Sequence, residues 1–318
     1  MSRVVVTDRT FPSLDQEERA AREAGAEFEA FQAKTAEEVA EAVRGADVAL
    51  VQFSPFTEAA AKGMAPGGTV IRYGVGYDNI DMAAARAAGL KVGYVPDYCA
   101  DEVADHTAAM ALAMLRKLPQ ADASVRAGEW AAVKVSRPLK PFGETVFGFF
   151  GLGQIGRAVL QRLKGFGFRF AASDPGLSAQ DAEALGVTLM DAETLLREAD
   201  VISLHAPATA QTRGFFNAQR LRWMKPNAIL VNSARGFLIE EADLAQALKE
   251  GVIGGAALDV FVTEPLPKDS PLRDAPNCLL TPHAAWYSEA AIGRLQGLVA
   301  EDVTRALRGE GPRKPVPD

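Results

Sequence analysis

The stretch Gly151-Leu152-Gly153-Gln154-Ile155-Gly156 decides the fold of this chain. Three glycines with this spacing are a weak signal alone, but the apolar run Thr145–Phe150 directly precedes them and a segment with helical apolar spacing follows. In that setting the first glycine allows a tight turn, the second lets the backbone approach a diphosphate, and the third lets the helix pack close to the strand. The helix N-terminus adds free N–H groups and a positive dipole end. The stretch therefore predicts a strand, a turn and a helix that bind a dinucleotide.

A carboxylate follows the next predicted strand at the position where a dinucleotide would present its adenosine ribose. Asp174 lies in Ala172-Ser173-Asp174-Pro175, at the end of the predicted strand Phe168–Ala172. A carboxylate there accepts hydrogen bonds from the ribose diol and repels a 2′-phosphate. We therefore expect NAD and not NADP as the cofactor.

Short apolar runs alternate with helical segments along two stretches of the chain. Such alternation predicts α/β architecture with parallel sheets that are covered on both faces. The first series of predicted strands is Arg3–Thr7, Glu27–Phe31, Val48–Gln52, Thr69–Tyr73 and Val92–Tyr94. The second series is Thr145–Phe150, Phe168–Ala172, Val187–Leu189, Val201–Leu204, Ile229–Asn232, Ala256–Val260 and Cys278–Leu280.

Two long helices link or follow these series. One is predicted from about Asp101 to Leu118, and it leads the chain from the first series to the second. The other is Ser288–Arg308, with Ile292, Leu295, Val299, Val303 and Leu307 on one face. No strand follows this last helix, so we expect it to pack back on the first unit. The proline-rich tail after Gly309 is expected to be loosely ordered.

The composition is that of an ordinary globular protein with room for about two domains. The chain has 318 residues, of which 48% are hydrophobic and 24% charged, and its formal net charge is −7. This acidic balance argues against nucleic-acid binding. Cys99 and Cys278 lack metal-ligand spacing, so no metal site is predicted, and they are expected to be reduced thiols. The run Ala108–Leu115 is too short to span a bilayer, and we expect a cytoplasmic protein without membrane contact.

Polar residues follow several strands of the second series. Ligands of open α/β sheets bind outside the carboxyl ends of the strands, so these residues are expected to share one crevice. They are His205-Ala206-Pro207, Ser233-Ala234-Arg235-Gly236, Asp259, Glu264 and His283.

Three of these side chains form a chemically specific set. Arg235 can direct a fork of donors at a carboxylate and an adjacent carbonyl. His283 can donate a proton to a carbonyl that is reduced by hydride, and Glu264 can hold the imidazole and favour its charged form. Taken singly, Arg235 is better explained as part of a surface ion pair and His283 as a core histidine. Their joint position around a dinucleotide motif favours the catalytic interpretation.

Several motifs resemble those of the D-isomer-specific 2-hydroxyacid dehydrogenases. Together they run from about residue 70 to 290 in an order and spacing that chance does not produce. They are Gly74-Val75-Gly76-Tyr77-Asp78-Asn79-Ile80-Asp81, the glycine loop at 151–156, Leu230-Val231-Asn232-Ser233-Ala234-Arg235-Gly236, Gly255-Ala256-Ala257-Leu258-Asp259-Val260-Phe261, Glu264-Pro265 and Thr281-Pro282-His283. Within the family, His283-Ala284-Ala285-Trp286-Tyr287-Ser288-Glu289 looks most like the C-terminal-binding protein branch.

The resemblance implies two doubly wound domains. One is a Rossmann NAD-binding domain at residues 101–285, and the other is a discontinuous flavodoxin-like substrate domain at residues 1–100 plus 286–318. It also implies a homodimer formed through the second unit, and a 2-oxo acid and a D-2-hydroxy acid as substrate and product. The sequence does not say which 2-oxo acid is used.

The resemblance also assigns site residues. The catalytic set is Arg235, Glu264 and His283. The substrate-binding set is Arg72, Tyr73, Gly74, Val75, Gly76 and Trp286, although simple packing is a competing interpretation of Trp286. The cofactor-binding set is Thr107, Gly151, Gly153, Gln154, Ile155, Gly156, Asp174, His205, Ala206, Pro207, Ser233, Ala234 and Asp259.

A different class of protein fits part of this pattern. An NADH-sensing, corepressor-like binding protein would also keep the dinucleotide motif, and any turnover would be incidental. The intact set of Arg235, Glu264 and His283 favours the enzyme.

Overall fold

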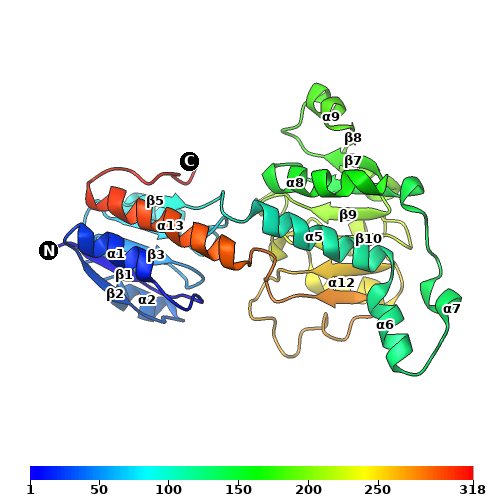
Figure 1. Cartoon of the computed structure of the whole chain (residues 1–318), viewed down its shortest axis with the longest axis horizontal. Coiled ribbons are helices and arrows are strands. Elements are labelled where there is room, and N and C mark those ends of the chain that lie inside the picture. Colours follow the sequence, from blue (N-terminus) through cyan, green and yellow to red (C-terminus); the bar gives the residue numbers. More distant parts are fainter. Residues whose placement is uncertain (318) are drawn as a thin grey trace. The chain divides into compact units, whose positions relative to one another are not determined.

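The computed structural model describes residues 1–317, which form two compact units (Figure 1). Unit 1 comprises Met1–Cys99 together with the stretch from Tyr287 onward, and unit 2 is Ala100–Trp286. The domain limits predicted from the sequence lie one residue from these boundaries. Within residues 1–317, no helix combines the length and the apolar character that crossing a bilayer requires.

Unit 1 is a parallel five-stranded sheet with the order β2-β1-β3-β4-β5, which is the flavodoxin-like order. Its strands are β1 (Arg3–Val6), β2 (Glu27–Ala30), β3 (Val48–Val51), β4 (Thr69–Arg72) and β5 (Lys91–Tyr94). Its helices are α1 (Asp15–Glu23), α2 (Ala36–Ala42), α3 (Glu58–Gly63), α4 (Met82–Ala87) and α13 (Glu289–Leu307). All five predicted strands are present, and their ends differ by one residue at most.

Helix α13 returns the end of the chain to unit 1, where it packs on α1. Leu295, Val299 and Val303 are buried as predicted, whereas Ile292 and Leu307 are only half-buried. The contact also has a polar part, because the Gln296 side chain donates to the Ser13 carbonyl (2.7 Å). The discontinuous domain that the topology suggested is therefore present.

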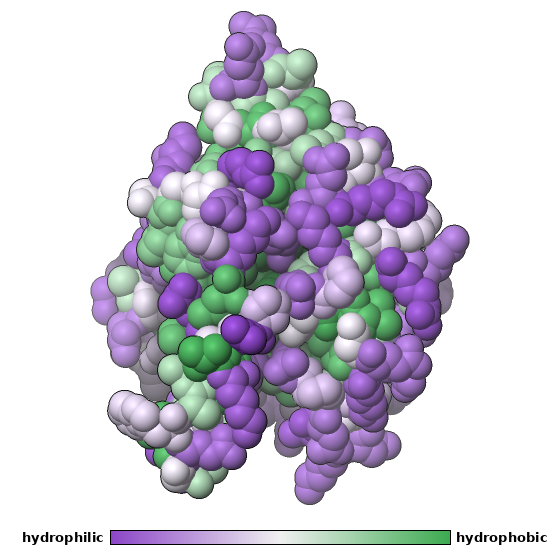
Figure 2. All heavy atoms as spheres, turned by 90° about the vertical axis from the view of Figure 1, so that its right-hand side faces the viewer, coloured by the Kyte–Doolittle hydropathy of each residue, from purple (hydrophilic) through white to green (hydrophobic). Residues whose placement is uncertain are grey.

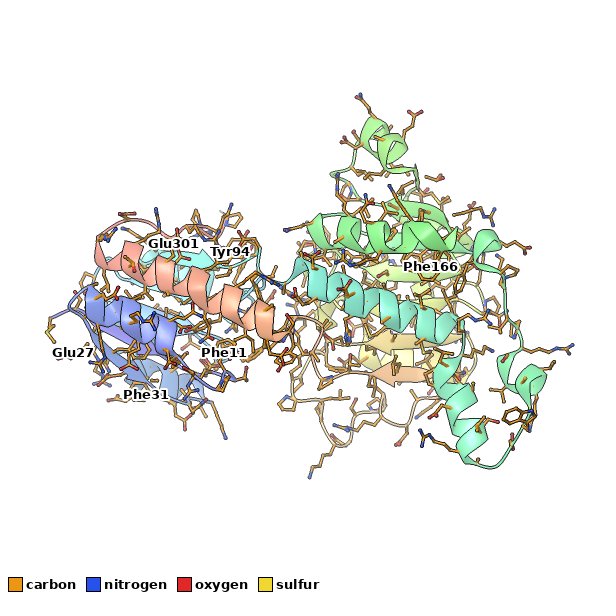
Figure 3. The ribbon with its side chains drawn as sticks, viewed as in Figure 1. Phe11, Glu27, Phe31, Tyr94, Phe166 and Glu301 are labelled. Carbon is orange, nitrogen blue, oxygen red and sulfur yellow. The ribbon has the colours of Figure 1, made fainter. Side chains whose placement is uncertain are left out.

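The C-terminal tail is ordered, and the expectation of a loose tail was wrong. The Tyr94 N–H donates to the Lys314 carbonyl (3.1 Å) and the Val316 N–H donates to the Val92 carbonyl (3.0 Å). Tyr94 ends β5, whose outer edge has unpaired backbone groups that the tail satisfies (Figure 3). Proline composition alone did not reveal this partner.

Unit 2 is a parallel seven-stranded sheet with the order β12-β11-β10-β9-β6-β7-β8. Read from β8, this is the Rossmann order 3-2-1-4-5-6 with one strand added. The strands are β6 (Val146–Phe150), β7 (Arg169–Ser173), β8 (Val187–Leu189), β9 (Val201–Leu204), β10 (Ile229–Asn232), β11 (Gly255–Leu258) and β12 (Cys278–Leu280). The fold class predicted from the sequence is confirmed.

Helices cover the sheet of unit 2. The α-helices are α5 (Ala100–Leu115), α6 (Leu118–Arg126), α7 (Ala132–Ser136), α8 (Gln154–Leu163), α9 (Ala179–Leu185), α10 (Ala192–Glu198), α11 (Ala218–Leu221) and α12 (Glu241–Lys249). The 3₁₀ turns are η1 (Phe142–Glu144), η2 (Lys164–Phe166) and η3 (Gly236–Leu238).

Strand β6 is anchored by apolar cores on both of its faces. Phe147 and Phe149 pack into one cluster with α5 and α8, and Phe150 packs into the other with α10 and α12. Gly148 lies so close to α10 that a Cβ there would be 2.9 Å from the Leu195 side chain. This double burial fixes the carboxyl end of β6, from which the glycine loop continues.

Candidate functional site

The loop between β6 and α8 has the backbone geometry that a dinucleotide site requires. Gly151 has a φ of +86°, and a Cβ there would lie 2.8 Å from the Ala206 backbone nitrogen. At Gly156 a Cβ would be 3.2 Å from the Gly151 carbonyl and 3.4 Å from the His205 ring. The first and third glycines are therefore required by the protein's own packing.

The second glycine of the loop has a different reason. Apart from its two neighbours in the chain, no atom of residues 1–317 lies within 4 Å of a Cβ built on Gly153. This residue is the N-cap of α8 and makes no side-chain cap. The first N–H groups of α8, from Gln154 and Ile155, therefore face an open cradle at the positive end of the helix dipole. An anionic diphosphate fits this cradle.

Asp174, the predicted partner of the adenosine ribose, lies beside the same loop. It follows β7, and its carboxylate accepts hydrogen bonds from the N–H groups of Leu152 (2.6 Å) and Gly176 (2.8 Å). These two bonds fix the carboxylate beside the glycine loop. Its remaining lone pairs can accept the hydroxyls of a ribose.

His205 follows β9 and lies under the loop as a neutral ring. Its Nε2 lies 2.7 Å from the Ser203 hydroxyl, and its buried Nδ1 has no hydrogen-bond partner. Burial lowers the pKa of His205 to about 3. His205 therefore shapes the loop and does not exchange protons near neutral pH. Ala206 packs beside Gly151, and Pro207 is exposed next to it.

The segment after β10 is held by a residue that the sequence analysis did not assign. The side chain of the fully buried Asn232 donates to the Arg235 carbonyl (2.9 Å) and accepts the Ala234 N–H (3.0 Å). A Cβ on Gly236 would lie 2.0 Å from the Phe261 carbonyl carbon. Because the backbones pack so closely, Arg235 is fixed against the segment that leads to Glu264.

His283 and Glu264 form a close pair. The distance from His283 Nδ1 to Glu264 Oε2 is 2.6 Å, and the other carboxylate oxygen accepts the Phe261 N–H (2.9 Å). Burial acts to raise the pKa of Glu264, but the hydrogen bond and charge of His283, the Phe261 N–H and the charge of Arg235 outweigh it. The net pKa lies below the usual value, so the carboxylate is ionised at neutral pH. The structure thus brings the three predicted catalytic residues together within unit 2.

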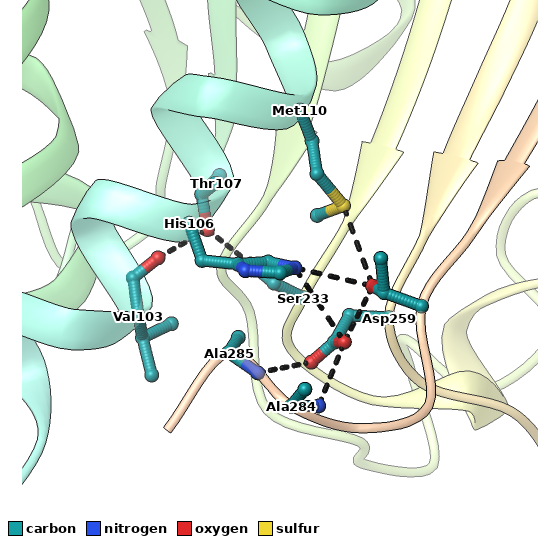
Figure 4. A network of polar contacts seen from close by, with 9 residues as sticks. Val103, His106, Thr107, Met110, Ser233, Asp259, Ala284 and Ala285 are labelled. Carbon is teal, nitrogen blue, oxygen red and sulfur yellow. Dashed lines mark hydrogen bonds and ion pairs between the residues drawn. The ribbon is translucent and has the colours of Figure 1, made fainter. Parts of the chain in front are cut away.

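Asp259 holds the turn that carries His283 (Figure 4). Its carboxylate is fully buried, and it accepts the Thr281 hydroxyl (2.6 Å) and the N–H groups of Ala284 and Ala285 (2.9 Å each). The His283 N–H donates to the Asp259 carbonyl (2.8 Å). A contact between Asp259 and the cofactor stays a prediction, whereas its role in this turn is visible.

Helix α5 contributes Thr107, which was predicted, and His106, which was not. The Thr107 hydroxyl donates to the Val103 carbonyl (2.6 Å) and lies 2.5 Å from the Ser233 hydroxyl. His106 Nε2 lies 3.1 Å from the Thr281 hydroxyl. No sequence signal connects His106 with Thr281, because only the packing of α5 on the sheet brings them together.

Arg72 belongs to unit 1, at the end of β4. Its guanidinium donates to the Tyr73 carbonyl and lies 5.9 Å from the centre of the Phe53 ring. Gly74 has a φ of +131°, and any Cβ there would collide with the guanidinium. Val75 and Gly76 follow in the same half-buried loop.

The Tyr73 side chain does not face this loop. It is buried, and its hydroxyl donates to Glu17 (3.0 Å) while the ring packs edge-on against Phe11. Burial, followed by the charge of Glu17, raises the pKa of Tyr73 well above its usual value. The prediction that Tyr73 binds substrate is therefore limited to its backbone. Trp286 is the half-buried last residue of unit 2, and its place in a substrate pocket stays a prediction.

Comparison with known proteins assigns unit 2 to a family. Residues 108–285 match the NAD-binding domain of D-isomer-specific 2-hydroxyacid dehydrogenases. The chain is also 41% identical over 248 residues to a glyoxylate reductase of Korarchaeum cryptofilum, covering 76% of this chain and 74% of that protein. The chain belongs to the D-isomer-specific 2-hydroxyacid dehydrogenase family.

Two further proteins match nearly the whole chain. A D-3-phosphoglycerate dehydrogenase of Methanocaldococcus jannaschii is 40% identical over 312 residues, which is 98% of this chain and 58% of that protein. The crystal structure of the TT0316 protein from Thermus thermophilus superposes with a TM-score of 0.86 at 33% identity, covering 99% of this chain and 100% of that one.

Substitution of Gly153 tests the open cradle. Gly153→Val should leave the fold intact, because no protein atom lies near the new side chain, and should fill the space that a diphosphate needs. We expect NADH binding, followed by fluorescence titration, to weaken by at least about tenfold, or roughly 1.4 kcal/mol. Gly165→Val is the matched control, since it also projects into open space but lies beyond α8. Equal NADH affinity in Gly153→Val and the wild type would contradict this assignment.

Proposed function

We propose that this protein is an NAD-dependent oxidoreductase that interconverts a 2-oxo acid and a D-2-hydroxy acid. The observation that carries the proposal is the 2.6 Å pair between His283 and Glu264, held beside Arg235 within an NAD-binding domain. Bound NAD supplies the hydride acceptor, and NADH the hydride donor. The D stereochemistry follows from the family and not from the geometry.

His283 is the proposed acid and base. Its Nδ1 faces the ionised Glu264. Nε2 is the atom that we propose gives a proton to the substrate oxygen during reduction and removes it during oxidation. The hydrogen bond and charge of His283 help to lower the pKa of Glu264, so the ring faces an ionised carboxylate. The Arg235 guanidinium is proposed to polarise the same oxygen and to hold the adjacent carboxylate.

We assign the substrate carboxylate in unit 1 to Arg72. Its guanidinium lies on Gly74, and the adjoining Phe53 loop is held by Asp8. The Asp8 carboxylate accepts the N–H groups of Gln52 (3.0 Å), Phe53 (2.6 Å) and Ser54 (3.1 Å). Arg72 is a cation beside a loop that is firmly held, which favours the binding of a small anion. The apolar Phe53 ring beside Arg72 can contact the side chain of the substrate.

The alternative, a corepressor-like NADH sensor, gains no support from the relatives described above, which are named as dehydrogenases or reductases. The deciding experiment is NADH oxidation with glyoxylate, pyruvate, hydroxypyruvate, 3-phosphohydroxypyruvate, phenylpyruvate and 4-methylthio-2-oxobutyrate. We expect steady turnover with at least one acid and its loss, by about 10²- to 10⁴-fold, in His283→Ala. Cofactor binding without turnover for every acid would favour the sensor.

Arg72→Ala tests the carboxylate site. The loss of one charge-assisted hydrogen bond corresponds to roughly 1.5–3 kcal/mol, so KM for the 2-oxo acid should rise about ten- to a hundredfold. Arg72→Lys keeps the charge but loses the fork of donors, so its KM should lie between those of the wild type and Arg72→Ala. Steady-state kinetics on the preferred acid give KM for each variant. An unchanged KM in Arg72→Ala would show that another group receives the carboxylate.

Glu264→Gln tests the acid and base. The substitution keeps the shape and removes the negative charge that favours imidazolium, so the decline of kcat/KM for reduction should begin at a lower pH. The rising limb for oxidation, which needs neutral imidazole, should move to lower pH as well. Glu241→Gln is the matched control, because Glu241 accepts the Val262 N–H (2.7 Å) and lacks the contact with His283, and it should shift both limbs less. If neither limb of the pH profiles moved in Glu264→Gln, the pairing of His283 with Glu264 would be refuted.

We also propose that a second copy of the chain covers the arm formed by α6 and α7. We further propose that the protein is cytoplasmic, because neither Cys99 nor Cys278 forms a disulfide. Neither helix has a buried residue, and the arm exposes Leu118, Val125, Trp130 and Val133. Figure 2 shows the side of the molecule that lies on the right in Figure 1, where α6 and α7 are labelled. Apolar patches lie among hydrophilic side chains on this face. Apolar groups gathered in this way mark an interface.

The arm can be tested by light scattering on the purified protein. Wild type should be a dimer, and the double variant Trp130→Glu, Val133→Glu should shift toward monomer, because charges replace apolar contacts. Leu189→Glu, which alters an exposed apolar side chain on β8, should leave the dimer intact. A monomeric wild type at micromolar concentration would remove the proposal.

A further inference from the structure

Of the three histidines in this chain, His283 is the proposed acid and base and His205 shapes the glycine loop, whereas His106 has no role assigned so far. It lies on α5 with 28% of its side chain exposed, and its ring points toward Asp259 (Figure 4). Its Nε2 is 3.1 Å from the Thr281 hydroxyl oxygen and 3.7 Å from Asp259 Oδ1.

Hydrogen counting fixes the direction of these bonds. The Thr281 hydroxyl has one hydrogen, and the 2.6 Å contact with Asp259 Oδ1 uses it, because a carboxylate only accepts. The Thr281 oxygen can then only accept from His106, so Nε2 must bear a hydrogen. This holds whether the ring is neutral or charged. The bonds therefore run from His106 to Thr281 and from Thr281 to Asp259.

This chain of bonds ends on the backbone around His283. Asp259 also accepts the N–H groups of Ala284 and Ala285, the two residues that follow His283. His283 itself has a φ of +52°, in the left-handed region that a residue with a side chain rarely adopts. Such a conformation persists only where the surrounding contacts determine it, and hydrogen bonds in a buried network strengthen one another.

We propose that His106 is a positioning residue that acts through Thr281 and Asp259 to hold the turn bearing His283. The proposal rests on the proposed function, in which His283 is the acid and base. Among the described residues, the polar contacts of the His106 side chain are with Thr281 and Asp259 and not with Glu264. Its contribution is a single N–H donor at Nε2, which orients the Thr281 hydroxyl toward Asp259.

Three variants separate this role from general packing. His106→Leu removes the donor, and His106→Gln offers an amide N–H in its place. Met110→Leu is the matched control, because Met110 contacts the same Thr281 hydroxyl through sulfur (3.7 Å) and the swap conserves volume without removing the His106 donor.

The first readout is hydrogen exchange of residues 281–286 in the full-length protein, which needs no substrate. In His106→Leu the amides of Ala284 and Ala285 should exchange about tenfold faster, since Asp259 is held less firmly. His106→Gln and Met110→Leu should exchange like the wild type. Unchanged exchange in His106→Leu, or equal acceleration in Met110→Leu, would overturn the proposal.

The second readout is the ¹⁵N spectrum of histidine-labelled wild type, where three histidines are assigned by single substitutions. Protonated Nε2 on His106 supports the proposal, and an unprotonated Nε2 overturns it, even where His106→Leu fails to fold. The third readout is kinetic. In His106→Leu, kcat should fall about ten- to a hundredfold through misplacement of His283, with little change in KM for NADH, and His106→Gln should recover most of it.

These readouts keep the two proposals apart. A wild type that reduces no 2-oxo acid would refute the proposed function, while exchange and the ¹⁵N spectrum would still decide whether His106 holds the turn. A raised KM for NADH in His106→Leu with unchanged exchange would assign His106 to the cofactor and refute the positioning role.

Discussion

The buried carboxylate of Asp259 is the group on which the arrangement of the candidate site depends. It directly follows β11 and accepts hydrogen bonds from Thr281, Ala284 and Ala285, while its carbonyl accepts the His283 N–H. A buried charge is tolerated only where such partners compensate for the loss of water. The same partners keep His283 in a left-handed conformation with its ring against Glu264. Folding stability and catalytic geometry are thus coupled in one cluster.

A second constraint acts at the glycine loop of unit 2, where two loops meet almost without side chains between them. Gly151 and Gly156 pack against the segment after β9, and Gly153 leaves space that the protein does not fill. Gly151 and Gly156 therefore serve the fold, whereas we predict that Gly153 leaves room for a ligand. The distinction is physical, because a Cβ at Gly151 or Gly156 meets other parts of the protein, whereas one at Gly153 has open space around it.

Unit 1 repeats the principle that a carboxylate organises a loop, with different residues. Asp8 holds the backbone of Gln52–Ser54 as Asp259 holds the turn after His283. Arg72 lies next to this loop, on a glycine that leaves room for its guanidinium. In unit 2 the histidine that we assign to chemistry is followed by backbone that a buried carboxylate holds, whereas in unit 1 Arg72 lies beside such backbone. Neither holding role could be recognised from spacing to a motif.

The sequence alone determined the fold class, the two series of strands and the glycine loop, because hydrophobic periodicity and backbone-permissive residues are local properties. It also indicated Arg235, Glu264 and His283, since residues at the carboxyl ends of parallel strands share one edge of the sheet. Only the tertiary structure decided the direction of the Tyr73 side chain, the docking of the tail on β5, and the roles of Asn232 and Asp8. It alone joined His106 to Thr281, 175 positions apart in the chain. Such contacts depend on packing between distant segments, for which a single sequence has no periodic signal.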